Sequence, residues 1–300
     1  MIEVKNLVKD YGKHHAVKDI SFSVPDGQIV GLLGPNGSGK TTTINCILAL
    51  LAFDKGTVRV FGREMRPDSY DLKRQIGVVM QNVAVFQELT VYENIDYFCG
   101  LYVPDKRKRK ELVEEAITFT DLNDYRKMRP KKLSGGLLRR LNIACGIAHK
   151  PRLIIMDEPT VGVDAQSRDL IMDSIKSLNQ AGSSIIYTSH YMHEVEELCD
   201  EIGIVNKGQM IARGTYEELA TEYADGNCFC VDTSKEALQF HMQEIMGKYV
   251  DLHVSVDENT LKFLVQGENH INRILQDMIS MNMPVSVSYT HLTLPTNSLV

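Results

Sequence analysis

The order of hydrophobic and polar positions predicts strands that alternate with helices over most of the chain. Short apolar runs at 28–33, 76–80, 153–156 and 184–187 are typical of buried strands, and the segment 167–179 has the apolar spacing of a helix. This alternation indicates a mainly parallel sheet that is covered on both faces by helices. We therefore expect an α/β fold.

Three segments depart from this alternation. Residues 1–30 read as strands with alternating apolar and polar positions, which predicts an N-terminal antiparallel β subdomain. A later stretch of helical spacing is too long for one crossover between parallel strands, so we expect an inserted α-helical subdomain at about 82–150. A first domain then spans 1–222, and short strands and helices at 223–286 predict a small C-terminal α+β domain.

The last residues of the chain carry an unusual pattern. Residues 287–296 resemble the in-frame translation of a sequencing adapter, so we interpret 287–300 as an artefactual tail and exclude it from the expected fold. The alternative is a genuine exposed tail.

Composition and charge narrow the choice of function. The chain has 300 residues, of which 43% are hydrophobic, and a formal net charge of −6. This acidic balance argues against a grip on phosphate backbones, so we expect no nucleic-acid partner. The basic run at 106–110 reads as the solvated start of a helix. No apolar run reaches the roughly 20 residues that span a bilayer, so a function at the membrane requires another chain as the channel.

The six cysteines are scattered along the chain. We expect them to be the reduced thiols of a cytosolic protein. Cys228 and Cys230 can share one face of a strand, but they lack a matching His or Cys partner, so a metal site there is the weaker interpretation.

A glycine-rich motif between a predicted strand and a predicted helix carries the strongest chemical signal. It fits the pattern G-x-x-x-x-G-K-[ST], and its residues are Gly34, Pro35, Asn36, Gly37, Ser38, Gly39, Lys40 and Thr41, followed by Thr42. Its glycines let backbone N–H groups converge on phosphates at the positive end of a helix dipole. Lys40 would neutralise phosphate charge, and the Thr41 hydroxyl would bind Mg²⁺. We expect this loop to bind a nucleotide.

Two carboxylates follow the apolar run at 153–156. Asp157 and Glu158 lie where the carboxyl ends of parallel strands line a ligand crevice. We expect Asp157 to hold Mg²⁺, directly or through water, and Glu158 to orient and deprotonate the attacking water. An ordinary strand end is the alternative, but the preceding phosphate loop favours catalysis.

A second glycine motif, Leu133-Ser134-Gly135-Gly136, introduces a helix that carries Arg139. Ser134 and the backbone N–H groups at this helix start offer donors to an anion, in a chain that already has one phosphate loop. The motif resembles the signature of ABC transporter ATP-binding subunits, in which two such domains meet head to tail around two ATP molecules. A flexible loop that caps a helix is the alternative.

Other residues match this family in its order along the chain. Tyr11 resembles the aromatic residue that stacks on adenine, and a structural tyrosine is the alternative. Gln81 resembles the glutamine that touches Mg²⁺ or the attacking water and signals to the membrane subunits. His190 resembles the histidine that contacts the γ-phosphate, and a metal site with His193 and Glu194 is the less favoured alternative.

The sequence also departs from the family at two places. Leu137 stands where many members have glutamine, and the segment that ends at Asp164, which resembles the loop crossing between the two ATPase domains, begins with a valine in place of a small residue. Neither change removes a phosphate donor or a carboxylate, so we expect hydrolysis to be retained.

The resemblance implies an ABC-type ATPase with the P-loop NTPase fold, with ATP as substrate and Mg²⁺ as cofactor. It also implies a homodimer or heterodimer of ATPase subunits, held at the cytoplasmic face of the membrane by separate transmembrane permease subunits. The chain looks most similar to the multidrug and antibiotic exporter branch. Alternatives are a soluble ABC-type ATPase unconnected with transport, and a nucleotide sensor without hydrolysis, against which Glu158 and His190 argue.

Overall fold

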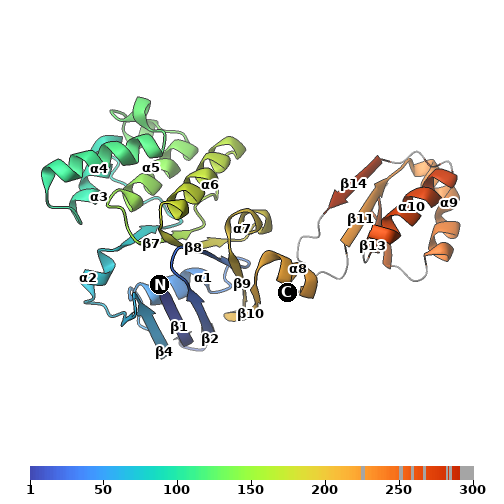
Figure 1. Ribbon diagram of the computed structural model, residues 1–300, viewed down its shortest axis with the longest axis horizontal. Helices are drawn as coiled ribbons and strands as arrows, with labels where there is room; N and C mark the ends of the chain where they lie inside the picture. Colours follow the sequence, from blue (N-terminus) through green and yellow to red (C-terminus); the bar gives the residue numbers. More distant parts are fainter. Residues whose placement is uncertain are drawn as a thin grey trace. The chain divides into compact units, whose positions relative to one another are not determined.

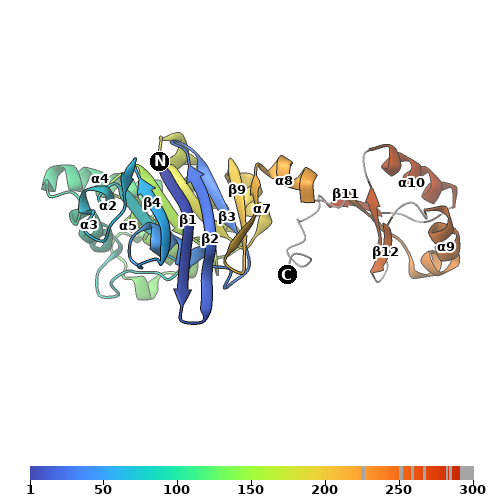
Figure 2. The same ribbon diagram turned by 90° about the horizontal axis from the view of Figure 1, so that it is seen from below.

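The computed structural model forms two compact units, Met1–Tyr216 and Glu217–Val300 (Figures 1 and 2). The structure describes residues 1–223, 227–249, 253–257, 260–265, 268–281, 283 and 286–290. Among these residues, no helix combines the length and the apolar character that crossing a bilayer demands.

A six-stranded sheet in the order β10-β9-β3-β8-β7-β6 forms the centre of the first unit. The strands are β3 (Ile29–Leu33), β6 (Ile76–Val79), β7 (Leu153–Asp157), β8 (Ser184–Ser189), β9 (Glu201–Asn206) and β10 (Gln209–Gly214). All neighbours pair in parallel except β9 and β10. Every residue of β3, β7 and β8 is buried, as expected for strands covered on both faces. The predicted α/β class with a mainly parallel sheet is confirmed.

The connections of this sheet include four helices, α1 (Lys40–Ile47), α2 (Tyr70–Lys73), α6 (Ala165–Gln180) and α7 (Met192–Leu198). Helix α1 ends at Ile47, although the apolar residues continue to Leu51. Ala49 adopts a left-handed φ of 49°, and the N–H groups of Leu50 and Leu51 both bond to the carbonyl of Asn45. The apolar residues at 48–51 therefore belong to a turn that closes the helix.

A second sheet, in the order β2-β1-β4-β5, forms the predicted antiparallel β subdomain. Its strands are β1 (Ile2–Tyr11), β2 (His14–Val24), β4 (Lys55–Val60) and β5 (Arg63–Glu64). The inward residues of this sheet share one hydrophobic core with α1 and the central sheet, including Val17, Ile44 and Ile155. This core fixes the phosphate-loop helix between the two sheets.

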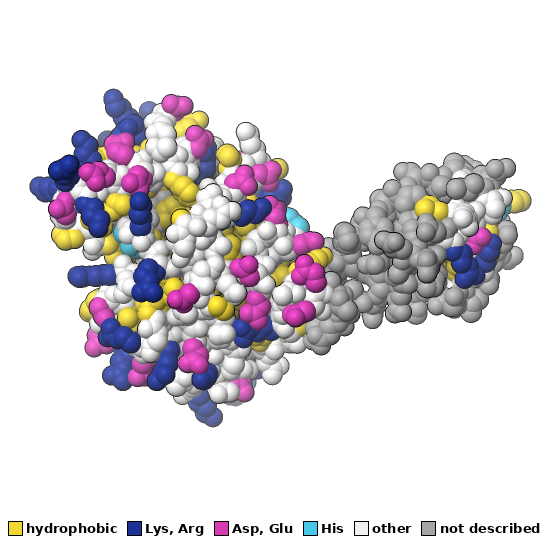
Figure 3. All heavy atoms as spheres, viewed as in Figure 1, with side chains coloured by type: hydrophobic (Ala, Val, Ile, Leu, Met, Phe, Trp, Pro, Cys, Tyr) yellow, Lys and Arg dark blue, Asp and Glu magenta, His cyan; other side chains and the backbone are white. Residues whose placement is uncertain are grey.

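The inserted helical subdomain contains α3 (Val91–Gly100), α4 (Lys106–Phe119) and α5 (Gly135–Ile147), with short 3-10 turns at Asn123–Tyr125 and Pro130–Lys132. Its helices begin at side-chain caps, namely Thr90, Asp105 and Ser134. It has a hydrophobic core of its own, which includes Ile95, Val113 and Leu141. The basic run lies in the first turns of α4, and Figure 3 shows Lys and Arg side chains gathered over this subdomain.

The second unit is an α+β structure. Helix α8 (Tyr216–Tyr223) is followed by β11 (Asn227–Asp232), α9 (Lys235–Lys248), β12 (His253–Asp257), β13 (Thr260–Val265), α10 (Glu268–Ser280) and β14 (Ser286–Thr290). The strands pair antiparallel in the order β12-β13-β11-β14, over a core that includes Leu238, Ile245, Phe263 and Ile274. The side chains of Cys228 and Cys230 lie outside the described residues.

Strand β14 contains the first residues of the segment that resembles adapter sequence. Residues 286–290 pair with β11, whereas 291–300 lie outside the described residues. The artefactual origin of 287–300 stays a prediction, as do the domain limits at 222 and 286.

The core of the first unit predicts that this unit folds without the second. Within the described residues, the hydrophobic cluster that includes Ile44 and the cluster that includes Leu141 contain no residue beyond 210. A chain of residues 1–223 should keep a cooperative thermal transition with a Tm within about 4 °C of the corresponding transition in the full chain, a change below about 1 kcal/mol. Differential scanning calorimetry measures this directly. Loss of the transition would show that the second unit supports the first.

Candidate nucleotide-binding and hydrolysis site

The candidate site lies at the edge of the central sheet where three parallel strands end. Leu33 of β3 is in register with Ser189 of β8, and Asp157 of β7 is in register with Thr188 of β8. The segments that follow these strands therefore start side by side. Ligands bind at this edge of open parallel sheets, where the carboxyl ends of the strands meet.

The phosphate loop is held by backbone contacts on both sides. The Gly34 N–H donates to the carbonyl of Ser189 (3.3 Å), and the Gly208 N–H donates to the carbonyl of Ser38 (2.9 Å). Gly34 has no space for a side chain, because a Cβ would lie 2.1 Å from the carbonyl oxygen of Val205. Gly39 has a φ of 109° where α1 begins, a conformation that favours glycine. The glycines thus serve a loop that is pressed against neighbouring backbone.

Lys40, the first residue of α1, is almost fully buried inside the loop. Its Nζ donates to the carbonyls of Gly34 (2.7 Å) and Pro35 (3.2 Å) and lies 3.3 Å from Oε1 of Glu158. Burial of both charges is tolerable because each has an ionic partner. Within the described residues, the Ser38 hydroxyl is buried without a hydrogen-bond partner. A buried cation, a free hydroxyl and a helix start fit the phosphates of a nucleotide.

Asp157 is buried between two hydroxyl groups. Thr41 Oγ1 donates to Oδ2 of Asp157 (2.9 Å), and Thr188 Oγ1 donates to Oδ1 (2.6 Å). Oxygen ligands of this kind suit Mg²⁺, which takes few protein ligands and completes its shell with phosphate and water. The described part of the chain has no group of three or more His, Cys, Asp or Glu side chains arranged for a metal. The sequence analysis did not identify Thr188, although it lies two residues before His190.

Glu158 is the centre of the polar contacts. Its Oε2 accepts a hydrogen bond from Gln81 Nε2 (3.0 Å) and lies 3.5 Å from His190 Nδ1. Its backbone N–H donates to Thr188 Oγ1 (3.0 Å), and its φ of 48° is left-handed. Unfavourable backbone angles persist where the surroundings enforce them, and they cluster at functional sites. The structure thus brings Lys40, Gln81 and His190 to one carboxylate.

A pocket of about 470 Å³ opens above these residues. It is lined by Tyr11, His14, Ala16, residues 36–42, Gln81 and Glu158. The Tyr11 ring is half exposed, with Lys9 Nζ 5.4 Å from the ring centroid. The ring is therefore available at the rim of the pocket for stacking against a base. His14 and Ala16 were not identified from the sequence, because no motif marks them.

The Ser134 turn lies apart from this pocket. Ser134 caps α5 by accepting a hydrogen bond from the Leu137 N–H (3.3 Å), and the pocket lining includes none of Ser134, Gly135 and Gly136. Gly136 packs so closely on α6 that a Cβ would lie 2.0 Å from Ser167 Oγ. Asp164 caps α6 through the Ser167 N–H (2.9 Å). The Ser134 turn and the segment at 161–164 are therefore adjacent.

Helix α5 also holds the segment that carries Gln81. Arg139 and Asn142 both donate to the carbonyl of Met80 (3.1 and 3.2 Å), and Asn142 Oδ1 accepts from the Ala84 N–H (3.2 Å). Burial lowers the pKa of Arg139. The side-chain amide of Asn142 therefore bonds to the backbone both before and after Gln81. The sequence pattern did not reveal this contact between distant residues.

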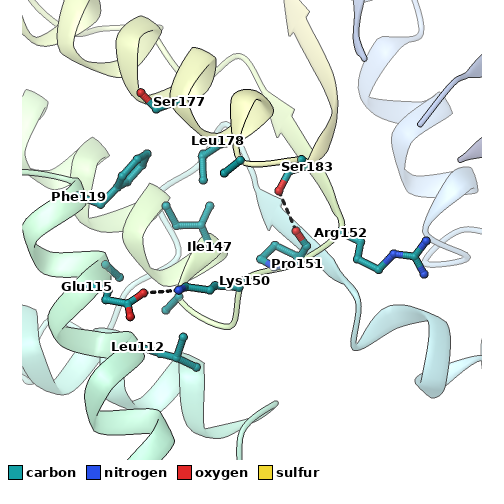
Figure 4. Close-up of a pocket in the computed structure, with 14 residues that line it drawn as sticks. Leu112, Glu115, Phe119, Ile147, Lys150, Pro151, Arg152, Ser177, Leu178 and Ser183 are labelled. Atoms are coloured by element: carbon teal, nitrogen blue, oxygen red, sulfur yellow. Dashed lines mark hydrogen bonds and ion pairs between the residues drawn. The ribbon is translucent and has the colours of Figure 1, made fainter. Parts of the chain in front are cut away.

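A second pocket, of about 520 Å³, lies next to the amino ends of β7 and β8 (Figure 4). Its walls include Leu112, Phe119, Ile147 and Leu178, and Pro151 precedes β7 there. Ion pairing between Lys150 and Glu115 and a hydrogen bond from Ser183 Oγ to the Pro151 carbonyl (3.0 Å) satisfy polar groups around it. It shares no lining residue with the nucleotide pocket.

The tight contact of Gly34 gives a prediction for the site. Gly34→Ala should weaken nucleotide binding at least about tenfold, about 1.4 kcal/mol, because the added methyl must displace the loop or Val205. Gly100→Ala is the matched control, since the flexible end of Arg109 is what its methyl would meet. Titration with a fluorescent ATP analogue measures both affinities. Equal affinities in both folded variants would contradict the assigned role of the loop.

The chain is similar to proteins of known family. The profile described as "ABC transporter" matches residues 17–161. The linearmycin resistance ATP-binding protein LnrL of Bacillus subtilis (strain 168) is 44% identical over 221 residues, which cover 74% of this chain and 71% of LnrL. The daunorubicin/doxorubicin resistance ATP-binding protein DrrA of Streptomyces peucetius is 38% identical over 218 residues, 73% of this chain and 66% of DrrA.

Solved structures agree with the sequence relatives. An ATP-binding subunit of an ABC transporter superimposes with a TM-score of 0.68 at 25% identity, over 74% of this chain and 93% of that one. A dimeric ATP-binding cassette in a post-hydrolysis state, bound to ADP and Pi, gives a TM-score of 0.66 at 25% identity. The match covers 72% of this chain and 98% of that one. The chain therefore belongs to the ABC transporter family, as one of its ATP-binding and ATP-hydrolysing subunits.

Proposed function

We propose that this chain is one half of an ATP-driven export motor, in which each ATP is held between the Lys40 loop of one subunit and the Ser134 turn of a second copy. One observation carries the proposal. The pocket is lined by the phosphate loop and by the carboxylate of Glu158, yet the donor-bearing start of α5 lies outside its lining. Two copies related by a two-fold axis would each complete the other's pocket.

Different parts of the site would bind the base, the phosphates and the metal ion of the nucleotide complex. Tyr11 stacks on the base, and the backbone N–H groups of the loop with Lys40 hold the phosphates. Thr41 and Asp157 would hold Mg²⁺, with Gln81 as a further contact, and the ion would supply positive charge that neutralises the phosphates. The 2.9 Å contact between Thr41 and Asp157 supports this assignment.

Hydrolysis would be carried by the side chains around Glu158. Its carboxylate orients a water molecule and accepts a proton while the water oxygen bonds to the γ-phosphorus and the bridging oxygen leaves with ADP. Gln81 and His190 lie beside the same carboxylate oxygen, which supports a role for them in holding the water and the γ-phosphate in line.

The dimer would close on ATP and open after hydrolysis. ATP contacts both subunits, so loss of the γ-phosphate removes an attraction between them. The grip of Asn142 and Arg139 on the Gln81 segment would carry this change between the helical subdomain and the catalytic edge. We further propose that separate permease subunits receive the motion at the cytoplasmic face of the membrane and export a drug or antibiotic. The similarity to the linearmycin resistance and the daunorubicin/doxorubicin resistance ATP-binding proteins supports export of such a compound.

Removal of the proposed base gives the first test. Glu158→Gln should lower kcat at least about 100-fold, because the proton acceptor is lost. The Kd for ATP should rise less than about threefold, because Lys40, released from its ion pair with Glu158, stays available to the phosphates. With ATP the variant should accumulate as a dimer in light scattering. Glu111→Gln, an exposed acid on α4, is the control. Normal turnover of Glu158→Gln would reject the base, and background turnover of the unaltered protein would favour a sensor.

Mixing two inactive variants tests whether the pocket is shared. Lys40→Ala disables the subunit's own phosphate loop, and Ser134→Arg blocks the turn offered to the second subunit. Each alone should be inactive. A one-to-one mixture should recover about a quarter of normal turnover, because half of the dimers contain one pocket with both parts intact. No gain on mixing, with exchange of subunits verified by labelled chains, would contradict a pocket completed in trans.

A further inference from the structure

A fully buried carboxylate, that of Glu194, lies on α7, four residues after His190. Glu194 is 0% exposed, and its Oε2 accepts hydrogen bonds from the hydroxyls of Tyr187 (2.9 Å) and Ser189 (2.6 Å). Within the described residues, its Oε1 is buried without a hydrogen-bond partner. Burial of a carboxylate without a full set of partners is unfavourable, so its presence calls for a physical reason.

The first partner, Ser189, fixes one side of His190. The Ser189 hydroxyl donates to Glu194 and accepts from the Tyr191 N–H (3.0 Å), so it closes a small turn around residue 190. Its backbone carbonyl accepts the Gly34 N–H from the phosphate loop. His190 is thereby set between two anchored neighbours, with its Nδ1 3.5 Å from Glu158.

The second partner, Tyr187, connects Glu194 to the turn after Glu158. Its hydroxyl lies 3.5 Å from Thr160 Oγ1, and Val161 in the same turn bonds back to the carbonyl of Glu158 (3.3 Å). Burial, with the neighbouring Glu194 charge, raises the pKa of Tyr187. The hydroxyl therefore stays protonated and donates to Glu194.

We infer that Glu194 is a positioning residue for hydrolysis, which sets the His190 turn through Ser189 and the Thr160 turn through Tyr187. One oxygen of Glu194 thus connects two segments beside Glu158. The first segment is the turn that carries His190, the proposed γ-phosphate contact, and the second is the Thr160 turn, which leads into the loop at 161–164. This inference rests on the proposed role of His190.

The test compares two substitutions of similar length at this position. Glu194→Met removes the acceptor and should lower kcat at least about tenfold with the KM for ATP changed less than about twofold, because the pocket-lining loop keeps its own backbone contacts. Glu194→Gln keeps an acceptor for both hydroxyls and should restore kcat to within about threefold of normal. Glu196→Gln, an exposed acid on the same helix, should leave kcat and KM unchanged.

A double-mutant cycle distinguishes positioning from general destabilisation. Ser189→Ala should lower kcat by itself but less than about twofold further in the Glu194→Met background, since both changes release the same turn. Independent, multiplicative effects, a change in Tm without a change in kcat, or no rescue by glutamine would overturn the inference. If Glu194→Met fails to fold, Tyr187→Phe and Ser189→Ala replace it, and normal kcat in both would overturn it equally.

His190→Ala in the same assay distinguishes failure of the proposed role of His190 from failure of the positioning role of Glu194. Normal turnover of His190→Ala would reject the proposed role of His190. Loss of turnover in His190→Ala together with unaffected kcat in Glu194→Met would reject the positioning role alone.

Discussion

The parallel pairing of β3, β7 and β8 is the constraint on which the rest of the structure depends. Because these strands are in register, the phosphate loop, Glu158 and His190 leave the sheet at one edge. A slip of one residue in this register would exchange the sides of the sheet to which Asp157 and Glu158 are directed. The ion pair of Lys40 with Glu158 then joins the first strand end to the second in a dry environment, where the charges interact strongly.

In the proposed dimer, helix α5 would connect this site to the second subunit. Its first turn presents Ser134 outside the chain's own pocket, while Asn142, further along the same helix, holds both sides of the Gln81 segment. The close contact of Gly136 with Ser167 ties the helix start to α6. A rigid helix that offers donors at one end and grips Gln81 along its length can couple the two sites of a dimer.

The sequence predicted the parts of the site that depend on local chemistry. The phosphate loop and the acids at the end of β7 are short contiguous patterns whose strand and helix context is visible from hydrophobicity alone. Thr188 and Asn142 were not predicted as parts of the site, and Glu194 was considered only for a less favoured metal site, because their roles arise from contacts with segments far away in the chain or from burial. The Thr188 hydroxyl bonds Asp157 only because β7 and β8 are neighbours, and the order of strands in a sheet is not written in any one segment.

A crystal structure of the Glu158→Gln variant with ATP and Mg²⁺ tests the central claim most directly. We expect two copies with each γ-phosphate within hydrogen-bond distance of Lys40 in one subunit and of Ser134 in the other, and with His190 turned toward the same phosphate. A γ-phosphate held by one chain alone, with every Ser134 remote from it, would contradict the account.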